Sequence, residues 1–134
     1  MSNIDLIRKF YSLPRNTREE RGALLDMLAD DIEYRGVGQE SAKGRDAIER
    51  LFRKYENSGQ SDIRFDIRHI AENGDVVLVD MVDTITIAGR SVAIVFSLVF
   101  KVRNGKIAYW QEHYDRAALE AAFGKRIPVT ELAP

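Results

Sequence analysis

The chain has 134 residues, with 20 Lys and Arg against 21 Asp and Glu, and its 45% hydrophobic residues are enough for the core of one domain. A net charge of −1 without a free cluster of Lys or Arg argues against nucleic acid as a partner. The absence of Cys excludes disulfides, thiol nucleophiles and thiolate metal sites.

The hydropathy pattern indicates a protein that is neither secreted nor membrane-bound. Asp5, Arg8 and Lys9 lie where a secretion signal requires an apolar run. The longest uncharged apolar segment, residues 91–100, is about half the length of a membrane-spanning helix and is typical of a buried strand. We therefore expect a cytoplasmic protein with no membrane partner.

Helical spacing dominates the first half of the chain. Apolar stripes predict helices over residues 2–14, 17–29 and 44–55, and the second of these begins at a Thr-x-x-Glu capping box. A short extended piece is expected over residues 32–35. The sequence shows no internal repeat and no linker between this half and the next.

From residue 61 onward the hydrophobic period changes to two. The turn pairs Asn73-Gly74, Ala88-Gly89 and Asn104-Gly105 separate β-rich runs, which predicts a four-stranded antiparallel meander. A last helix is expected from Asp115, a good N-cap, to Gly124. These elements together predict a single α+β domain over residues 1–134.

The strand register decides which side chains share a face, because a slip of one residue inverts every side chain. Three-residue loops at both Asn-Gly turns and a two-residue turn at Ala88-Gly89 would collect the apolar residues on one inner face. On that face Ala108 is expected, Asp83 lies opposite Ile94, and Glu112 lies opposite Phe96. A candidate ligand pocket is then lined by Phe65, His69, Met81, Ile94, Phe96, Trp110 and Tyr114.

Asp83 and Glu112 are carboxylates on this otherwise apolar face, and no inward Lys or Arg of the sheet accompanies them. Buried acids that lie close together tend to share one proton, which supplies an acid and a base at neutral pH. The alternative is structural, since a strand-borne acid is often paired with a buried Arg or a hydroxyl. His69 is interpreted as a satisfied inner histidine rather than a catalytic one.

The outer face carries an apolar patch that no predicted helix covers. We expect it to form a homodimer, because twofold pairs are the commonest oligomers. Its members are Leu78, Val82, Ala93, Val95, Val99, Ile107 and Tyr109.

The order of elements and the segment FKVRNGKIAYWQEHYD, residues 100–115, resemble the nuclear-transport-factor-2-like superfamily, specifically its SnoaL-like and limonene-epoxide-hydrolase-like branch. The resemblance implies a cone-shaped fold, in which a curved, mainly antiparallel sheet wraps about three N-terminal helices and a short C-terminal helix follows. It also implies a deep apolar pocket for a small hydrophobic molecule and dimerisation through the sheet. The scaffold hosts isomerases, cyclases, hydrolases and non-enzymes.

The epoxide hydrolase pattern carries over in part. The resemblance implies catalytic roles for Asp83, Glu112 and Tyr34, whereas the Arg that bridges the two acids is replaced by Met81 and the water-holding Asn by Gly36. The missing Arg disfavours epoxide hydrolysis, because it would keep both acids ionised and aligned.

The sequence thus predicts isomerase-, cyclase- or hydrolase-type acid/base chemistry without metal or organic cofactor. In this hypothesis Asp83 removes a proton, and protonated Glu112 or Tyr34 donates one to an oxyanion. The alternative is a non-catalytic dimeric module that binds a small ligand.

Overall fold

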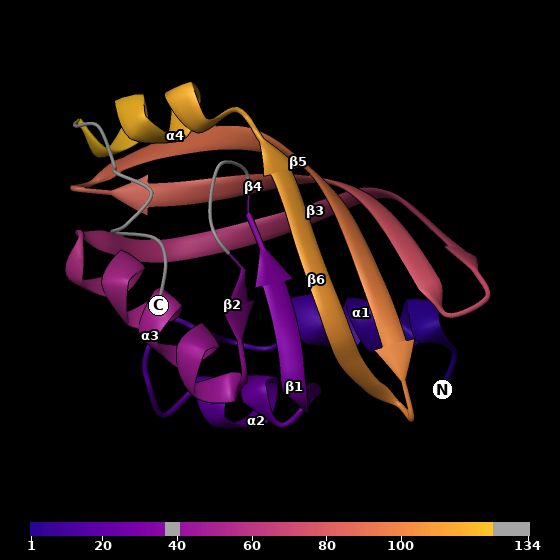
Figure 1. Ribbon diagram of the computed structural model, residues 1–134. Coiled ribbons are helices and arrows are strands. Elements are labelled where there is room, and N and C mark those ends of the chain that lie inside the picture. The colour runs from indigo at the N-terminus through magenta and orange to yellow at the C-terminus, as the bar shows by residue number, and fades with distance from the viewer. Residues whose placement is uncertain (37–40, 125–134) are drawn as a thin grey trace.

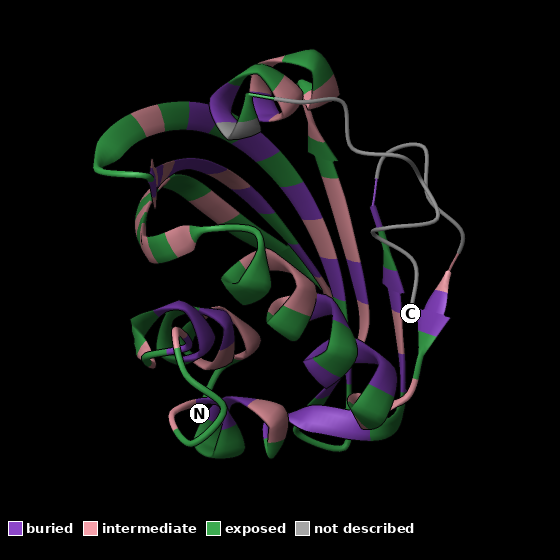
Figure 2. Cartoon of the chain, turned by 90° about the vertical axis from the view of Figure 1, so that its left-hand side faces the viewer, coloured by how far each residue is buried: buried purple, intermediate pink, exposed green. Residues whose placement is uncertain are grey.

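The computed structural model describes residues 1–36 and 41–124. The expected domain also includes residues 37–40 and 125–134, which lie outside this range. A six-stranded curved sheet wraps around three helices, which lie inside its curve (Figures 1 and 2): α1 (Asn3–Ser12), α2 (Arg21–Leu25) and α3 (Arg45–Asn57). The expected α+β class and the curved sheet around three N-terminal helices are confirmed. In the described segments no helix is both long and apolar enough to cross a membrane.

The helices begin where the sequence offers caps. In α1 (Asn3–Ser12) the Ser2 hydroxyl accepts from the Asp5 amide at 3.1 Å, and in α4 (Arg116–Phe123) Asp115 caps the Ala118 amide at 3.1 Å. Gly124 ends α4 in the left-handed conformation, with φ of 69°. Helix α3 spans Arg45–Asn57.

The second predicted helix is too long. The capping box forms, because Thr17 N donates to Glu20 Oε1 and Glu20 N donates to Thr17 Oγ1, both at 3.2 Å. The helix α2, however, covers only Arg21–Leu25, and the chain enters β1 at Leu28. Leu28 is fully buried in the core from a strand, so tertiary burial overrides the local helical spacing.

The sheet is mixed and has the order β2-β1-β6-β5-β4-β3. The strand bounds are β1 Leu28–Arg35, β2 Ala42–Lys43, β3 Gln60–Asn73, β4 Val76–Ile87, β5 Arg90–Arg103 and β6 Lys106–Tyr114. The last four form the expected antiparallel meander, while β1 pairs with β6 in parallel. The parallel pair places β1 beside β6, between β6 and the edge strand β2.

The predicted loops of the two Asn-Gly turns are wrong, although most of the face assignment holds. Both loops have two residues, since Asn73 pairs with Val76 and Arg103 pairs with Lys106. The shift of one residue comes instead from bulges inside the strands, at Arg68 in β3 and at Ala108 in β6. At Ala88-Gly89 the predicted two-residue turn is confirmed, and Asp83 lies opposite Ile94.

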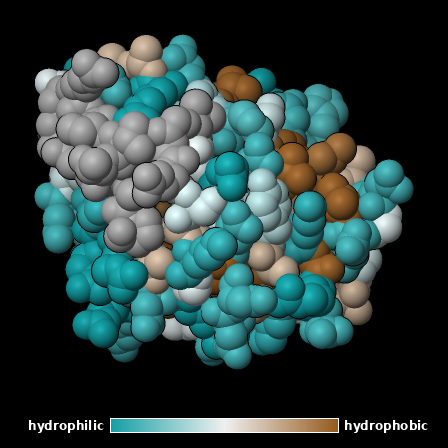
Figure 3. Space-filling model, in the orientation of Figure 1, coloured by the Kyte–Doolittle hydropathy of each residue, from teal (hydrophilic) through white to brown (hydrophobic). Residues whose placement is uncertain are grey.

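The bulge at Ala108 changes three positions of β6. Glu112 lies opposite Leu98 rather than Phe96. Ile107 is fully buried in the core rather than part of the outer patch, and Ala108 is the unpaired bulge residue. The outer face still exposes large apolar side chains, with Leu78 at 50% and Val95 at 56% of their surface, and Figure 3 shows hydrophobic atoms gathered over these strands.

Candidate functional site

Asp83 lies on β4 with Phe65 of β3 on one side and Ile94 of β5 on the other. Only 4% of its surface is exposed, and its Oδ1 finds no hydrogen-bond partner among the described residues. Burial and, to a smaller extent, the charge of Glu112 raise the pKa of Asp83 to about 8, although the charge of Arg15 opposes both. A carboxyl group in this position favours its protonated form at neutral pH.

Glu112 reaches the same space from β6 and is bound by a tyrosine of the neighbouring strand. Tyr34 on β1 pairs with Trp110 on β6, and its hydroxyl donates to Oε2 of Glu112 at 2.8 Å. Burial raises the pKa of Glu112 and outweighs the Tyr34 hydrogen bond, the Arg15 charge and the nearby Trp110 indole, which lower it, so that the pKa is about 7. The ionised form of Glu112 is therefore better stabilised by hydrogen bonds than the ionised form of Asp83.

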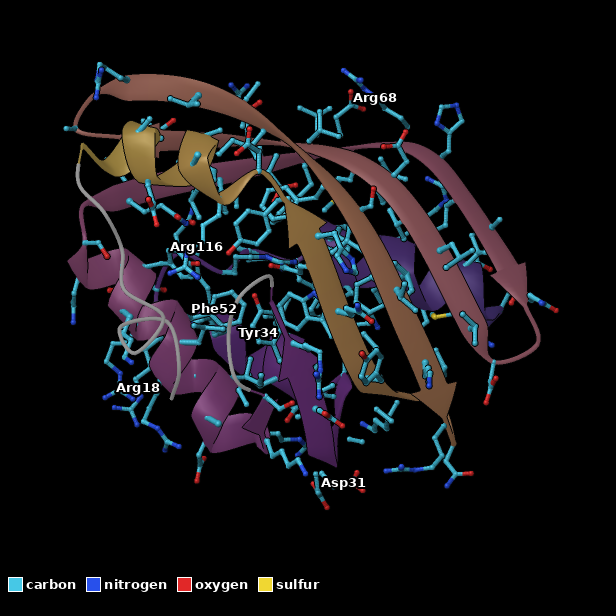
Figure 4. The ribbon with its side chains drawn as sticks, turned by 45° about the horizontal axis from the view of Figure 1, so that its top comes forward. Arg18, Asp31, Tyr34, Phe52, Arg68 and Arg116 are labelled. Carbon is cyan, nitrogen blue, oxygen red and sulfur yellow. The ribbon has the colours of Figure 1, made fainter. Side chains whose placement is uncertain are left out.

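Tyr34 keeps its proton in this arrangement. Burial, followed by the charge of Glu112, raises the pKa of its phenol well above the ordinary value. Its ring meets the indole of Trp110 edge-on, with centroids 5.0 Å apart. Figure 4 shows Tyr34 and Phe52 directed into the interior between β1 and α3. The site thus contains a fixed phenol donor.

Arg15 is the functional candidate that the sequence reasoning missed. It lies in the loop between α1 and α2 with 5% of its surface exposed, and its guanidinium lies over the Phe10, Tyr11 and Phe65 rings at 4.9, 5.2 and 4.6 Å from their centroids. One Nη donates to the carbonyl of Phe10. Burial lowers its pKa to about 10, while the negative forms of Tyr11, Asp83 and Glu112 oppose this shift.

This arginine corrects the expectation that no inward cation accompanies the two acids. The expectation considered the Lys and Arg of the strands, and Met81, where the resemblance implied that a bridging Arg is replaced, is buried on β4. The cation instead enters from a loop, where neither period 2 nor period 3.6 predicts the direction of a side chain. The only local signal for Arg15 in the sequence is its position directly after Pro14 and shortly before a capping box.

Asp83, Glu112, Tyr34 and Arg15 all line one cavity of about 90 Å³. Its aromatic wall is formed by Tyr11, Phe52, Phe65, Phe96, Trp110 and Tyr114. The cavity has room for several water molecules or for part of a small organic molecule. The inner sheet face and α1, the following loop and α3 enclose it together.

The structure separates the seven expected pocket residues into three groups. Phe65, Phe96, Trp110 and Tyr114 line the cavity. Met81 and Ile94 are buried in the hydrophobic core but are not part of the lining. The placement of His69 is wrong, because the bulge at Arg68 turns it to the outer face, where Nδ1 lies 3.0 Å from Oδ2 of Asp80.

A buried ion-pair network forms the wall near α3. The guanidinium of Arg21 is 1% exposed and binds both carboxylate oxygens of Glu49, at 2.8 and 2.9 Å, and also Oε1 of Glu56 at 2.8 Å. Arg21 is therefore satisfied by its own partners, unlike Arg15. Across residues 1–36 and 41–124, no three His, Asp or Glu side chains gather in a way that could hold a metal ion.

The chain matches the family model of the SnoaL-like domain over residues 7–110. It belongs to the SnoaL-like family. No curated protein sequence matches this SnoaL-like chain significantly.

Solved structures of distant sequence share the fold of this SnoaL-like protein. An LEH-like epoxide hydrolase of M. tuberculosis superimposes with a TM-score of 0.74 and 23% identity, over 90% of this chain and 88% of that one. A candidate polyketide cyclase of Xanthomonas campestris superimposes with a TM-score of 0.72 and 19% identity, over 90% of this chain and 96% of that one. A protein of Catenulispora acidiphila with a ketosteroid isomerase-like fold was solved in complex with trimethylamine. It superimposes with a TM-score of 0.75 and 19% identity, over 94% of this chain and 95% of that one.

Proposed function

We propose that this SnoaL-like protein is a cofactor-independent enzyme that transfers a proton on a small, largely hydrophobic molecule held in the cavity. The observation that carries the proposal is that Asp83 and Glu112 line one cavity in different hydrogen-bonding environments, with the Tyr34 hydroxyl bound to Glu112 alone. Pairs of acids whose environments differ are the usual basis for dividing the roles of acid and base.

The hydrogen bonds reverse the roles expected from the sequence. A phenol that donates to Glu112 stabilises its ionised form, so Glu112 is the base. The unpartnered Oδ1 of Asp83 has no donor to stabilise a charge, so Asp83 holds the proton and is the acid. The positive charge of Arg15 favours one negative charge on the pair.

The proposed step is balanced without any redox partner. Glu112 removes a proton from a carbon next to a carbonyl group, and the electron pair moves onto the carbonyl oxygen. Protonated Asp83 donates a hydrogen bond or its proton to this developing oxyanion. When the carbonyl compound has a β,γ double bond, Glu112 returns the proton to the γ-carbon, the double bond moves to the α,β position, and any transferred proton returns to Asp83, which restores the starting enzyme.

Deuterium wash-in tests this proposal without knowledge of the product. A panel of small cyclic ketones and enones is incubated with the protein in D₂O, and exchange at the α-carbon is followed by proton NMR. Glu112→Gln and Asp83→Asn should each slow exchange by about 100-fold, whereas Asp66→Asn, an exposed acid on β3, should not. Exchange that survives Glu112→Gln would refute the assignment of the base.

The other reading is a non-catalytic module that binds a small ligand in the same cavity. It requires no difference between the two acids. Carboxyl-carbon NMR titration distinguishes the two functions, because the enzyme requires at least one acid that titrates well above an ordinary pKa of about 4. Ordinary titration of both acids, with saturable binding of a small ketone, would favour the module.

Epoxide hydrolysis is a second candidate, and Arg15 is the observation that favours it. This buried cation faces both acids, which is the role that Met81 leaves vacant on β4. In this reaction Asp83 protonates the epoxide oxygen, and Glu112 removes a proton from the attacking water. Conversion of styrene oxide to its diol, with loss of activity in Glu112→Gln, is the expected result.

We also propose that two copies associate through the outer face of the sheet. Leu78 and Val95 are large apolar side chains that remain exposed there in the single chain. Burying such a patch against a second copy is the usual way to remove it from water.

A further inference from the structure

Four buried side-chain atoms have no hydrogen-bond partner within the described parts of the chain, and all four belong to residues that line the cavity. They are Oη of Tyr11, Nε of Arg15, Oδ1 of Asp83 and Nε1 of Trp110. Most buried polar groups in folded proteins are paired, so unpaired groups need an explanation wherever they occur. Because all four atoms belong to the lining of one cavity, a single molecule bound there can pair with several of them.

The identity of these atoms restricts the chemistry of that molecule. The Nε of arginine and the indole nitrogen of tryptophan can only donate, and the Tyr11 hydroxyl is free to donate. The Trp110 nitrogen lies near Glu112 and Tyr11 but without the geometry of a full hydrogen bond. Donors therefore outnumber acceptors in the cavity, and the missing partner must offer acceptor oxygens.

Charge restricts it further. None of the ion pairs among the described residues involves Arg15, whose guanidinium lies instead against the rings of Phe10, Tyr11 and Phe65. A buried cation without a close counter-ion is costly, and a carboxylate is its best geometric partner. A neutral carbonyl would satisfy the donors but would leave the Arg15 guanidinium without a direct ion-pair partner.

We propose that the molecule bound in the cavity carries a carboxylate, which is held by Nε of Arg15 and Oη of Tyr11. Its apolar body packs on the aromatic wall of Phe65, Phe96 and Trp110. This inference rests on the cavity of the proposed function as a ligand site, but it does not require turnover. It assigns Arg15 as the residue that selects acids over neutral molecules of the same shape.

The test compares two probes that differ only in the head group, cyclohexanecarboxylate and cyclohexanecarboxamide. The chain has one tryptophan, Trp110, so its fluorescence reports directly on the cavity. The wild-type protein should bind the carboxylate about tenfold or more tightly than the amide, which corresponds to a charge-assisted hydrogen bond. Saturation-transfer NMR of the probe checks the same ranking independently.

Two substitutions in one loop provide the matched comparison. Arg15→Met should remove most of the preference for the carboxylate. Arg18→Met removes the same charge three positions later, from an exposed side chain that points outward in Figure 4, and should leave the preference unchanged. General electrostatic attraction to the surface would affect both variants alike.

A milder second variant keeps the test valid if Arg15→Met does not fold. Tyr11→Phe deletes a hydroxyl that has no partner, so the thermal midpoint should not fall. The affinity for cyclohexanecarboxylate should still drop several-fold.

Three results would overturn the inference. These are equal affinity of the wild-type protein for both probes, carboxylate binding that survives both Arg15→Met and Tyr11→Phe, and no saturable carboxylate binding up to its solubility limit. The proposed function is judged separately by deuterium exchange into ketones. A protein that selects the carboxylate without exchange fails the proposed function alone, and one that exchanges without selecting it fails this inference alone.

Discussion

The hydroxyl of Tyr34 donates a 2.8 Å hydrogen bond to Oε2 of Glu112 across the one parallel strand pair among the described strands. The bond lowers the pKa of Glu112 against the stronger effect of burial, which leaves it at about 7. Asp83 and Glu112 both line the cavity, but they differ in their hydrogen bonds, because Tyr34 donates to Glu112.

Tyr34→Phe should raise the pKa of Glu112 further, because the ionised form loses a donor and the protonated form does not. The pH at which deuterium exchange reaches half its maximum should move upward, with a drop of about tenfold in rate at neutral pH. Carboxyl-carbon NMR measures the same shift directly. Tyr109→Phe, on the outer side of β6, is the control. An unchanged Glu112 titration in Tyr34→Phe would contradict the assigned hydrogen bond.

The stability of the protein should fall as pH rises from about 4 to about 8. Asp83 and Glu112 have raised pKa values in the folded protein, about 8 and about 7, so the folded state binds more protons than the unfolded state in this window. Their stabilising contribution is fully present below the unfolded pKa values and is lost as pH rises through the folded values.

Asp83→Asn should reduce this pH dependence, because the amide cannot ionise. Each pKa unit corresponds to about 1.4 kcal/mol. The free energy of unfolding of the variant minus that of the wild type should therefore be larger at pH 8 than at pH 4, by on the order of 1 kcal/mol or more. Urea unfolding at both values measures this difference. Asp66→Asn serves as the control. Equal pH slopes for Asp83→Asn and the wild type would show that Asp83 titrates normally.

The ion pairs of Arg21 should contribute unequally to stability. Glu49→Gln leaves a buried guanidinium without its two-point partner and should cost about 3 kcal/mol. Glu56 is 41% exposed at its side chain, so Glu56→Gln should cost less than about 1 kcal/mol. Chemical denaturation of the two variants gives the comparison. A larger loss in Glu56→Gln would reverse this ranking of the two pairs.

Charges on the outer sheet face should prevent association of two copies. Val95→Lys and Leu78→Lys each place a cation in the apolar patch and should convert a dimer to a monomer in multi-angle light scattering. Ser61→Lys, which adds the same charge at the exposed start of β3, should remain a dimer. A monomeric wild-type protein at micromolar concentration would refute the dimer.

The sheet face on which Asp83 lies could be predicted, because the residues of the next turn determine the type of that turn by themselves. Ala88-Gly89 adopts positive φ at both positions, 51° and 79°, and fixes the β4–β5 register directly. The bulges at Arg68 and Ala108 follow from how the strands curve around the helices, and no local residue pattern announces them. His69 was misplaced for that reason.

Arg15 escaped prediction for a different reason. A loop residue has no periodic face, so only the packed rings around its guanidinium reveal its direction. Asp83 and Glu112 were found because ionisable residues interrupt an apolar alternation, which is a signal that a strand carries and a loop does not.

The parallel pairing of β1 with β6 also determines when the site can exist. Tyr34 and Glu112 are 78 residues apart in the chain, and Glu112 lies on β6, the last of the described strands in chain order. A nascent chain that ends after β5 contains Asp83 and Tyr34 but lacks the second acid. The two acids of the cavity are therefore present together only after the chain from β1 to β6 has been synthesised.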